Sequence, residues 1–223
     1  MKPYSFMLNA QEMANRHADF LGFGYNDLQT KGIIWVLSRV RVVFNRIPKW
    51  NEDVTMETWH KGNDRLFGIR DFRMDTLSGE SLAVATSSWL IIGSASRRIQ
   101  RIDQYLGENS PGVNKVDAIV TPAAKLVSPA QMTFVRKRRV EFSDIDINNH
   151  TNNAKYIEWA FDCIDQQVSS SMEVKEFTVN FNSESRIGEE IDMYLTDNGT
   201  VAFIEGKREE TSVFQTEIIY NRK

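Results

Sequence analysis

Phe44-Asn45, followed after six residues by Glu52-Asp53-Val54-Thr55-Met56, is the most informative pattern for the fold, because it occurs twice in the chain. Its second copy reads Phe181-Asn182 and, again after six residues, Glu189-Glu190-Ile191-Asp192-Met193, so both blocks recur 137 residues later. Similarity at one fixed spacing is the mark of an internal repeat. The sequence therefore predicts two halves that are built alike.

Each half is expected to contain one long helix and a run of antiparallel strands. In the first half Asn9 is a plausible N-cap with Glu12 three residues later, and the predicted helix ends near Gly22. Its apolar face is expected to hold Met13, His17, Phe20 and Leu21. Runs rich in Val, Ile, Phe and Trp predict strands at about 33–45, 53–60, 66–74 and 82–93. In the second half we expect a helix at 153–167 and strands near 134–142, 177–181, 191–195, 201–207 and 213–220, with a tight hairpin at Asn198-Gly199.

One helix per half is too few to cover these strands individually, which favours a curved antiparallel sheet wrapped around the helix. The expected class is α+β, with a first domain at residues 1–106 and a second at 132–223. Between them, residues 107–131 have weak periodicity and several Gly and Pro residues, which is typical of a linker.

Composition narrows the class of protein. The chain has 223 residues, is 41% hydrophobic and has a net charge of −3, which fits a globular protein and argues against nucleic-acid binding. No apolar run approaches the roughly 18 residues of a membrane span. The single cysteine, Cys163, cannot form an intrachain disulfide, and the first residues lack secretory or transit features, so we expect a cytoplasmic location. His17 and His60 are isolated and no nucleotide-binding fingerprint is present, so no metal and no cofactor is expected.

The densest polar cluster, residues 144–153, lies directly before the predicted second helix. Its Asp and Asn residues favour turns and N-caps, and free N–H groups at a helix start favour a developing oxyanion. Asp146, Asn148 and His150 alternate, so an extended or loop-like backbone would direct all three side chains to one side. An alternative is that the run merely caps the helix, the role we expect for Asn152 and Asn153.

The segment closely resembles the acyl-acyl carrier protein thioesterase family, plant plastidial and bacterial. The family run Asp-x-Asn-x-His-x-Asn-Asn, leading into Lys-Tyr-Ile-x-Trp, is matched at every defining position between Asp146 and Trp159. The stretch from Arg46 to Trp59 in the first half also looks like the family. The resemblance implies a tandem double hotdog fold, with the catalytic residues in the C-terminal hotdog and an acyl-chain pocket shaped largely by the N-terminal one.

One departure concerns the nucleophile. The family has a further acid followed by a cysteine, and Glu184 followed by Ser185 stands at that place here, 34 residues after His150. Because Cys163 falls within the predicted helix, a Cys–His mechanism is in doubt; a nucleophilic Ser185 is less economical. We expect Glu184 and His150 to activate water, either being the general base, while Asp146 and Asn148 hold the loop and polarise the thioester carbonyl.

The resemblance implies hydrolysis of fatty acyl-acyl carrier protein to free fatty acid and holo-carrier protein. The alternatives are an acyl-CoA thioesterase on the same fold and a non-catalytic module that senses acyl thioesters. Two basic clusters, Arg97 to Arg101 and Arg136 to Arg139, could dock an acidic carrier protein or be solvated faces. A homodimer stays open, and the sequence does not predict the chain length or saturation of the acyl group.

Overall fold

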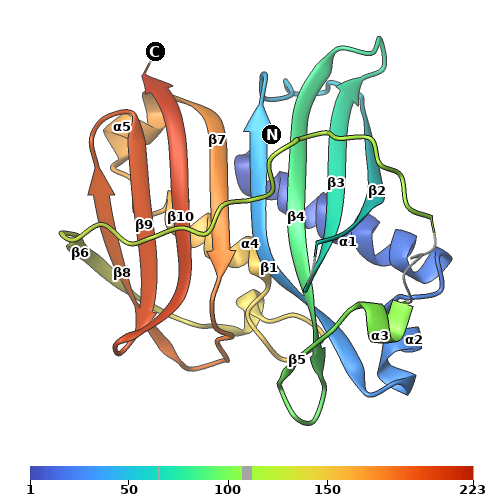
Figure 1. Ribbon diagram of the computed structural model, residues 1–223. Helices are drawn as coiled ribbons and strands as arrows, with labels where there is room; N and C mark the ends of the chain where they lie inside the picture. Colours follow the sequence, from blue (N-terminus) through green and yellow to red (C-terminus); the bar gives the residue numbers. More distant parts are fainter. Residues whose placement is uncertain (65, 107–111, 223) are drawn as a thin grey trace. The chain divides into compact units, whose positions relative to one another are not determined.

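A computed structural model describes residues 1–64, 66–106 and 112–222 of the chain (Figure 1). The described residues fall into two compact units, unit 1 being Met1–Lys2 with Phe6–Ala123 and unit 2 being Pro3–Ser5 with the chain from Ala124 onward. Part of the expected linker, 107–111, lies outside the described residues. From 114 to 132 the chain forms no helix or strand.

Unit 1 contains one long helix against an antiparallel sheet. Its elements are α1 (Pro3–Phe20), α2 (Tyr25–Thr30), β1 (Ile33–Phe44), β2 (Val54–Asp64), β3 (Phe67–Thr76), β4 (Ser81–Gly93), β5 (Ile99–Gln100) and α3 (Asp103–Leu106). The strands pair in the order β2-β3-β4-β1, and β5 pairs with β4. α1 runs across one face of this sheet, where the ring of Phe6 packs edge-on against Phe44 and Phe72 (Figure 1).

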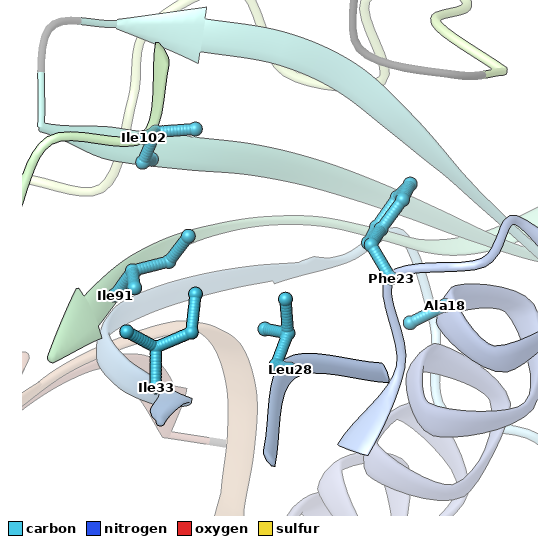
Figure 2. Packing of buried hydrophobic residues seen from close by; sticks show 6 residues of the cluster. All are labelled: Ala18, Phe23, Leu28, Ile33, Ile91 and Ile102. Atoms are coloured by element: carbon cyan, nitrogen blue, oxygen red, sulfur yellow. The ribbon is translucent and has the colours of Figure 1, made fainter. Parts of the chain in front are cut away.

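A buried apolar cluster closes one end of unit 1. Figure 2 shows its six side chains, which come from α1, α2, β1, β4 and the loops that follow α1 and β5: Ala18, Phe23, Leu28, Ile33, Ile91 and Ile102. Phe23 and Ala18 lie next to each other at the end of α1. Burial of apolar side chains of this kind contributes about 1.5–3 kcal/mol for each large residue.

The predicted start and face of the first helix are wrong. α1 begins at Pro3, a residue suited to the first helical position, and Asn9 lies exposed inside the helix. Its buried positions are Phe6, Met7, Ala10, Ala14 and Ala18, whereas the Phe20 side chain is 85% exposed. Alanines spaced by four residues form the buried stripe because they let the helix approach the sheet closely.

Unit 2 repeats the topology of unit 1. Its elements are β6 (Thr133–Arg139), the 3-10 helix η1 (Phe142–Asp144), α4 (Asn153–Phe161), α5 (Gln166–Ser171), β7 (Met172–Phe181), β8 (Glu190–Asp197), β9 (Val201–Arg208) and β10 (Thr211–Arg222). The strand order β8-β9-β10-β7 matches β2-β3-β4-β1, and β6 is added beside β8. The two sheets, each with a helix across one face, confirm the α+β class and the tandem double hotdog expected from the sequence.

Two local predictions in unit 2 have different outcomes. The hairpin at Asn198-Gly199 joins β8 to β9, and Gly199 has a φ of 92°, which a residue with a side chain rarely adopts. The helix expected at 153–167 is instead broken: α4 ends at Phe161, and α5 starts after Asp165, whose side chain accepts the N–H of Gln167 at 2.8 Å. In the described part of the chain, no helix combines the length and apolarity needed to cross a membrane.

Candidate active site

The polar run forms a compact turn between η1 and α4. The N–H of Asp146 donates to the carbonyl of His150 at 2.8 Å, and the N–H of Asn149 donates to the carbonyl of Asp146 at 3.1 Å. Asn149 has a φ of 60°, a conformation that Asn tolerates better than most residues. Of the two backbone forms expected here, extended or loop-like, the structure has the loop-like one, because the turn closes on itself.

The Asp146 side chain accepts hydrogen bonds from the backbone of this turn. Its Oδ1 accepts the N–H of Asn148 at 2.8 Å and the N–H of His150 at 3.2 Å. The carboxylate therefore fixes the position from which the His150 side chain leaves the chain, and Asn148 is left exposed at the tip of the turn. Hydrogen bonds to a charged acceptor contribute more than neutral ones, so this turn is held firmly.

The structure brings His150 and Glu184 together. Nε2 of His150 lies 3.2 Å from Oε2 of Glu184, and the two side chains are 21% and 33% exposed, so solvent reaches both. Glu184 lies between β7 and β8, and its carbonyl accepts a hydrogen bond from Nη1 of Arg208 at 3.1 Å. A carboxylate at this distance orients the imidazole and selects its tautomer.

A buried ring of hydrogen bonds joins the two segments that carry this pair. Oγ of Ser185 lies 2.7 Å from Oγ1 of Thr151 and 2.8 Å from the hydroxyl of Tyr156, which also accepts the Ser185 N–H at 3.1 Å. The N–H of Thr151 donates to the Ser185 carbonyl at 2.9 Å. Ser185 is 0% exposed, and its hydroxyl is hydrogen-bonded to both Thr151 and Tyr156. It therefore holds the site together and is not placed to attack a substrate.

The N-terminus of α4 is capped from within. Oδ1 of Asn152 accepts the N–H of Ala154 at 2.9 Å, as expected for a cap, and the N–H of Lys155 donates to the Asn152 carbonyl. Asn153 is the first helical residue and not the cap. Since these N–H groups already donate hydrogen bonds, they are not available to an oxyanion. The exposed side-chain amide of Asn148, at the tip of the turn, is left as the candidate donor to an oxyanion.

Cys163 takes no part in this arrangement. It lies just beyond the end of α4 and not within the helix, and its Sγ donates to the Trp159 carbonyl at 3.3 Å. Burial raises the pKa of the thiol to about 11, so it stays protonated at neutral pH. The structure therefore shows no activated thiol for a Cys–His mechanism.

Three residues that hold the site were not predicted from the sequence: Thr151, Tyr156 and Arg208. Thr151 lies within the polar run and Tyr156 within the helix that follows it, both segments that the sequence singled out. Their hydrogen bonds to Ser185 could not be predicted, because these depend on the fold. Arg208, at the end of β9, gives no sequence signal of its role. Within the described ranges no three His, Cys, Asp or Glu side chains gather as metal ligands would.

Comparison with known proteins identifies the family. The model of the acyl-ACP thioesterase N-terminal domain matches residues 1–108, and that of the C-terminal domain matches 127–222, ACP being acyl carrier protein. The chain is 29% identical over 212 residues to oleoyl-acyl carrier protein thioesterase 2, chloroplastic, of Arabidopsis thaliana, covering 83% of this chain and 55% of the relative. It is 25% identical over 211 residues to dodecanoyl-[acyl-carrier-protein] hydrolase, chloroplastic, of Cinnamomum camphora, covering 86% and 54%. The chain thus spans about half the length of the curated relatives it matches.

Solved structures share the fold over nearly the whole chain. An acyl-ACP thioesterase from Bacteroides thetaiotaomicron superposes with a TM-score of 0.88 at 24% identity, covering 99% of this chain and 90% of that one. The 12:0-ACP thioesterase from Umbellularia californica superposes with a TM-score of 0.89 at 22% identity, with the same coverage. The two family models together account for almost the entire sequence, and the chain belongs to the acyl-ACP thioesterase family.

Proposed function

We propose that this protein hydrolyses the thioester of fatty acyl-ACP to free fatty acid and holo-carrier protein, and that unit 2 carries out the reaction. The observation that supports this most directly is the pair formed by His150 and Glu184, 3.2 Å apart and partly open to solvent, on a turn fixed by Asp146. Family membership and the activities of the relatives named above supply the substrate class.

Water is the nucleophile in this proposal. One of the pair removes a proton from water as the water oxygen attacks the thioester carbonyl, and the proton then passes to the sulfur of the phosphopantetheine arm as the C–S bond breaks. If Nε2–H of His150 donates to Glu184, the lone pair of Nδ1 is free to act as the base. Alternatively, with the same hydrogen bond in place, the second carboxylate oxygen of Glu184 is the base. Asn148 polarises the carbonyl from the tip of the turn.

The two halves divide the work in this proposal. Residues 132–223 form the catalytic domain, residues 1–106 receive the acyl chain, and residues 107–131 connect them. The polar run supports this division because it has no counterpart in the first half, where Met13 stands 137 residues before His150. One active site per chain follows.

The test is thiol release from a panel of acyl-ACPs and matched acyl-CoAs, with wild type beside His150→Ala, Glu184→Ala and Glu184→Gln. Each alanine variant should lose about a hundredfold or more in kcat, the usual contribution of a positioned acid or base. Glu210→Gln is the matched control, because Glu210 is an exposed carboxylate at the turn between β9 and β10 of the same unit. If both alanine variants stay within a few-fold of wild type, the assigned pair is wrong.

The glutamine variant separates the two candidate bases. Gln keeps a hydrogen-bond acceptor beside His150 but cannot remove a proton. Glu184→Gln should therefore keep much of the activity if His150 is the base and fall as far as Glu184→Ala if Glu184 is. Faster hydrolysis of CoA esters than of acyl-ACPs would support the proposed site but identify acyl-CoA as the substrate. Hydrolysis of neither class would favour a non-catalytic sensing module.

A further inference from the structure

Unit 1 contains a pocket between α1 and the sheet whose polar side chains have no role in the proposed reaction. Apolar and aromatic side chains form most of its wall: Ala14, Ala18, Phe23, Trp35 and Trp89. Ala18 and Phe23 belong to the buried cluster at the end of α1, so one side of the pocket is continuous with the core (Figure 2). Phe23 packs edge-on against Trp35, with ring centroids 6.3 Å apart. Such a wall suits the body of an apolar ligand.

A buried cation lines this apolar pocket. Arg70 is 6% exposed, and the two hydrogen bonds of its side chain both leave from Nη1, to Nδ1 of His17 at 2.9 Å and to Oγ1 of Thr58 at 3.2 Å. In the part of the chain that the structure describes, no carboxylate pairs with it. The neighbouring Asp71 pairs with Lys61 at 3.2 Å instead. A buried charge without a counter-charge is costly, and burial lowers the pKa of Arg70 to about 10.

A second buried polar group lies directly opposite Arg70 on the neighbouring strand. His60 on β2 pairs with Arg70 on β3, also lines the pocket and is only 3% exposed. Its Nε2 has no hydrogen-bond partner among the described residues. Buried polar atoms are rarely left without a partner, so this nitrogen and the free edge of the guanidinium point to a ligand that supplies hydrogen-bond acceptors.

We propose that this pocket binds the carboxylate of an apolar chain, with Arg70 as the anchor and His60 as a second hydrogen-bonding group. Nε and Nη2 of Arg70 are free to donate, and a guanidinium edge binds a carboxylate through two parallel hydrogen bonds. A chain that ends in a methyl group would leave the guanidinium dry and unpaired, whereas a carboxylate supplies both the charge and the acceptors.

Two sources can provide this chemistry. One is a free fatty acid, the product of the proposed reaction, bound with its carboxylate inward. The other is a substrate acyl chain with a carboxylate at its far end. The binding site itself does not depend on the proposed function; only the identification of the fatty acid as a product does.

Isothermal titration with decanoate and 1-decanol, below their aggregation limits, tests the carboxylate directly. Wild type should bind decanoate at least tenfold more tightly than decanol, and Arg70→Met should remove that preference while decanol binding stays unchanged, since a charge-assisted pair contributes about tenfold or more. Arg73→Met is the matched control, because Arg73 is on the same strand but exposed and paired with Glu57. Arg70→Lys keeps the charge without the fork, so intermediate affinity is expected.

Equal binding of decanoate by wild type and Arg70→Met, with thermal unfolding confirming that the variant is folded, would overturn the proposal. So would equal affinity of wild type for decanoate and decanol. His150→Ala should bind decanoate like wild type, so the binding proposal and the hydrolysis proposal are tested independently. Hydrolysis of decanoyl and ω-carboxydecanoyl thioesters then separates the two sources. If Arg70→Met lowers kcat/KM only for the ω-carboxydecanoyl thioester, the carboxylate enters on the substrate. If Arg70→Met only relieves inhibition by decanoate, the free acid is the ligand.

Discussion

At the scale of single residues, the site depends on side chains that do no chemistry. His150 and Glu184 meet because Ser185, next to Glu184, is locked to Thr151, next to His150, and to Tyr156 on α4. From the sequence we predicted that His150, in the polar run, and Glu184, identified through the family resemblance, belong to one site, and the structure places their side chains 3.2 Å apart. The sequence did not predict the ring of hydroxyl groups behind them, because such contacts depend on how two distant segments fold together.

Ser185→Ala tests whether that ring is structural. The change removes the Ser185 hydroxyl from a fully buried position and leaves Thr151 and Tyr156 without one partner each. We expect the free energy of unfolding to fall by about 1–3 kcal/mol, the usual penalty for a broken buried hydrogen bond. The turnover number should stay within about tenfold of wild type, because the usual acid–base contribution comes from His150 and Glu184, which remain.

Chemical denaturation and thiol release measure these two quantities. Ser143→Ala is the control, since Ser143 is exposed on η1 and its loss should change neither. A fall in turnover of several orders of magnitude with stability unchanged would contradict the structural role and would instead identify Ser185 as the nucleophile.

At the scale of elements, strands were easier to predict than helices. Eight of the nine strand predictions place each strand within a few residues of its position, because β-branched and aromatic runs end at Gly, Asn and Asp. The ninth, 177–181, lies within the longer β7. The long helices were misplaced for two reasons. The buried stripe of α1 is made of alanines, which carry little hydrophobic signal, and apolar spacing continues past α4 through the buried Cys163 and Ile164 although the backbone turns there.

The interface of α1 with β2 and β3 should make stability depend on pH. Burial, together with the nearby charge of Arg70, lowers the pKa of His60 from 6.5 to about 4, and His17 is lowered in the same direction by the same two causes. A lowered pKa means that the unfolded state takes up the proton first. The free energy of unfolding is therefore retained above pH 6.5 and falls as the pH drops from 6.5 to about 4, by about 3 kcal/mol for His60.

Urea denaturation between pH 4 and 8 measures this dependence. His60→Gln cannot titrate in this range, so its curve of stability against pH should be flatter than that of wild type by the His60 contribution. His17→Gln on the same background isolates the remaining part from His17. Parallel curves for wild type and His60→Gln would show that His60 is not buried as a neutral group.

At the scale of the whole molecule, the two units share a topology but not a chemistry. In unit 2 the polar turn lies between β6 and α4, and the strand β6 has no equivalent in the pairing order of unit 1. In unit 1 the buried polar side chains Arg70 and His60 line the pocket against α1 instead. The two units are thus similar frameworks, and only unit 2 has the polar run, because Met13 stands in unit 1 at the position that corresponds to His150.

The net charge of −3 bears on how an acidic carrier protein would approach, because a favourable encounter then needs a local positive surface. β6 provides one, since Arg136 and Arg139 are exposed and the chain runs from β6 through η1 into the His150 turn. The other basic residues of β6 are engaged: Lys137 pairs with Glu190 at 3.0 Å, and Arg138 lies over the Trp159 ring.

Changing both exposed arginines to glutamate should raise KM for acyl-ACP about tenfold or more. The difference in KM between wild type and the variant should shrink as salt is added, because salt screens the charges. Hydrolysis of the matched acyl-pantetheine, which has neither protein nor nucleotide, should be unaffected because the catalytic pair is untouched. Arg98→Glu, an exposed position of the other basic cluster, is the control. Equal losses with both substrates would place the β6 arginines in the site itself, and an effect of Arg98→Glu alone would assign docking to the cluster after β4 instead.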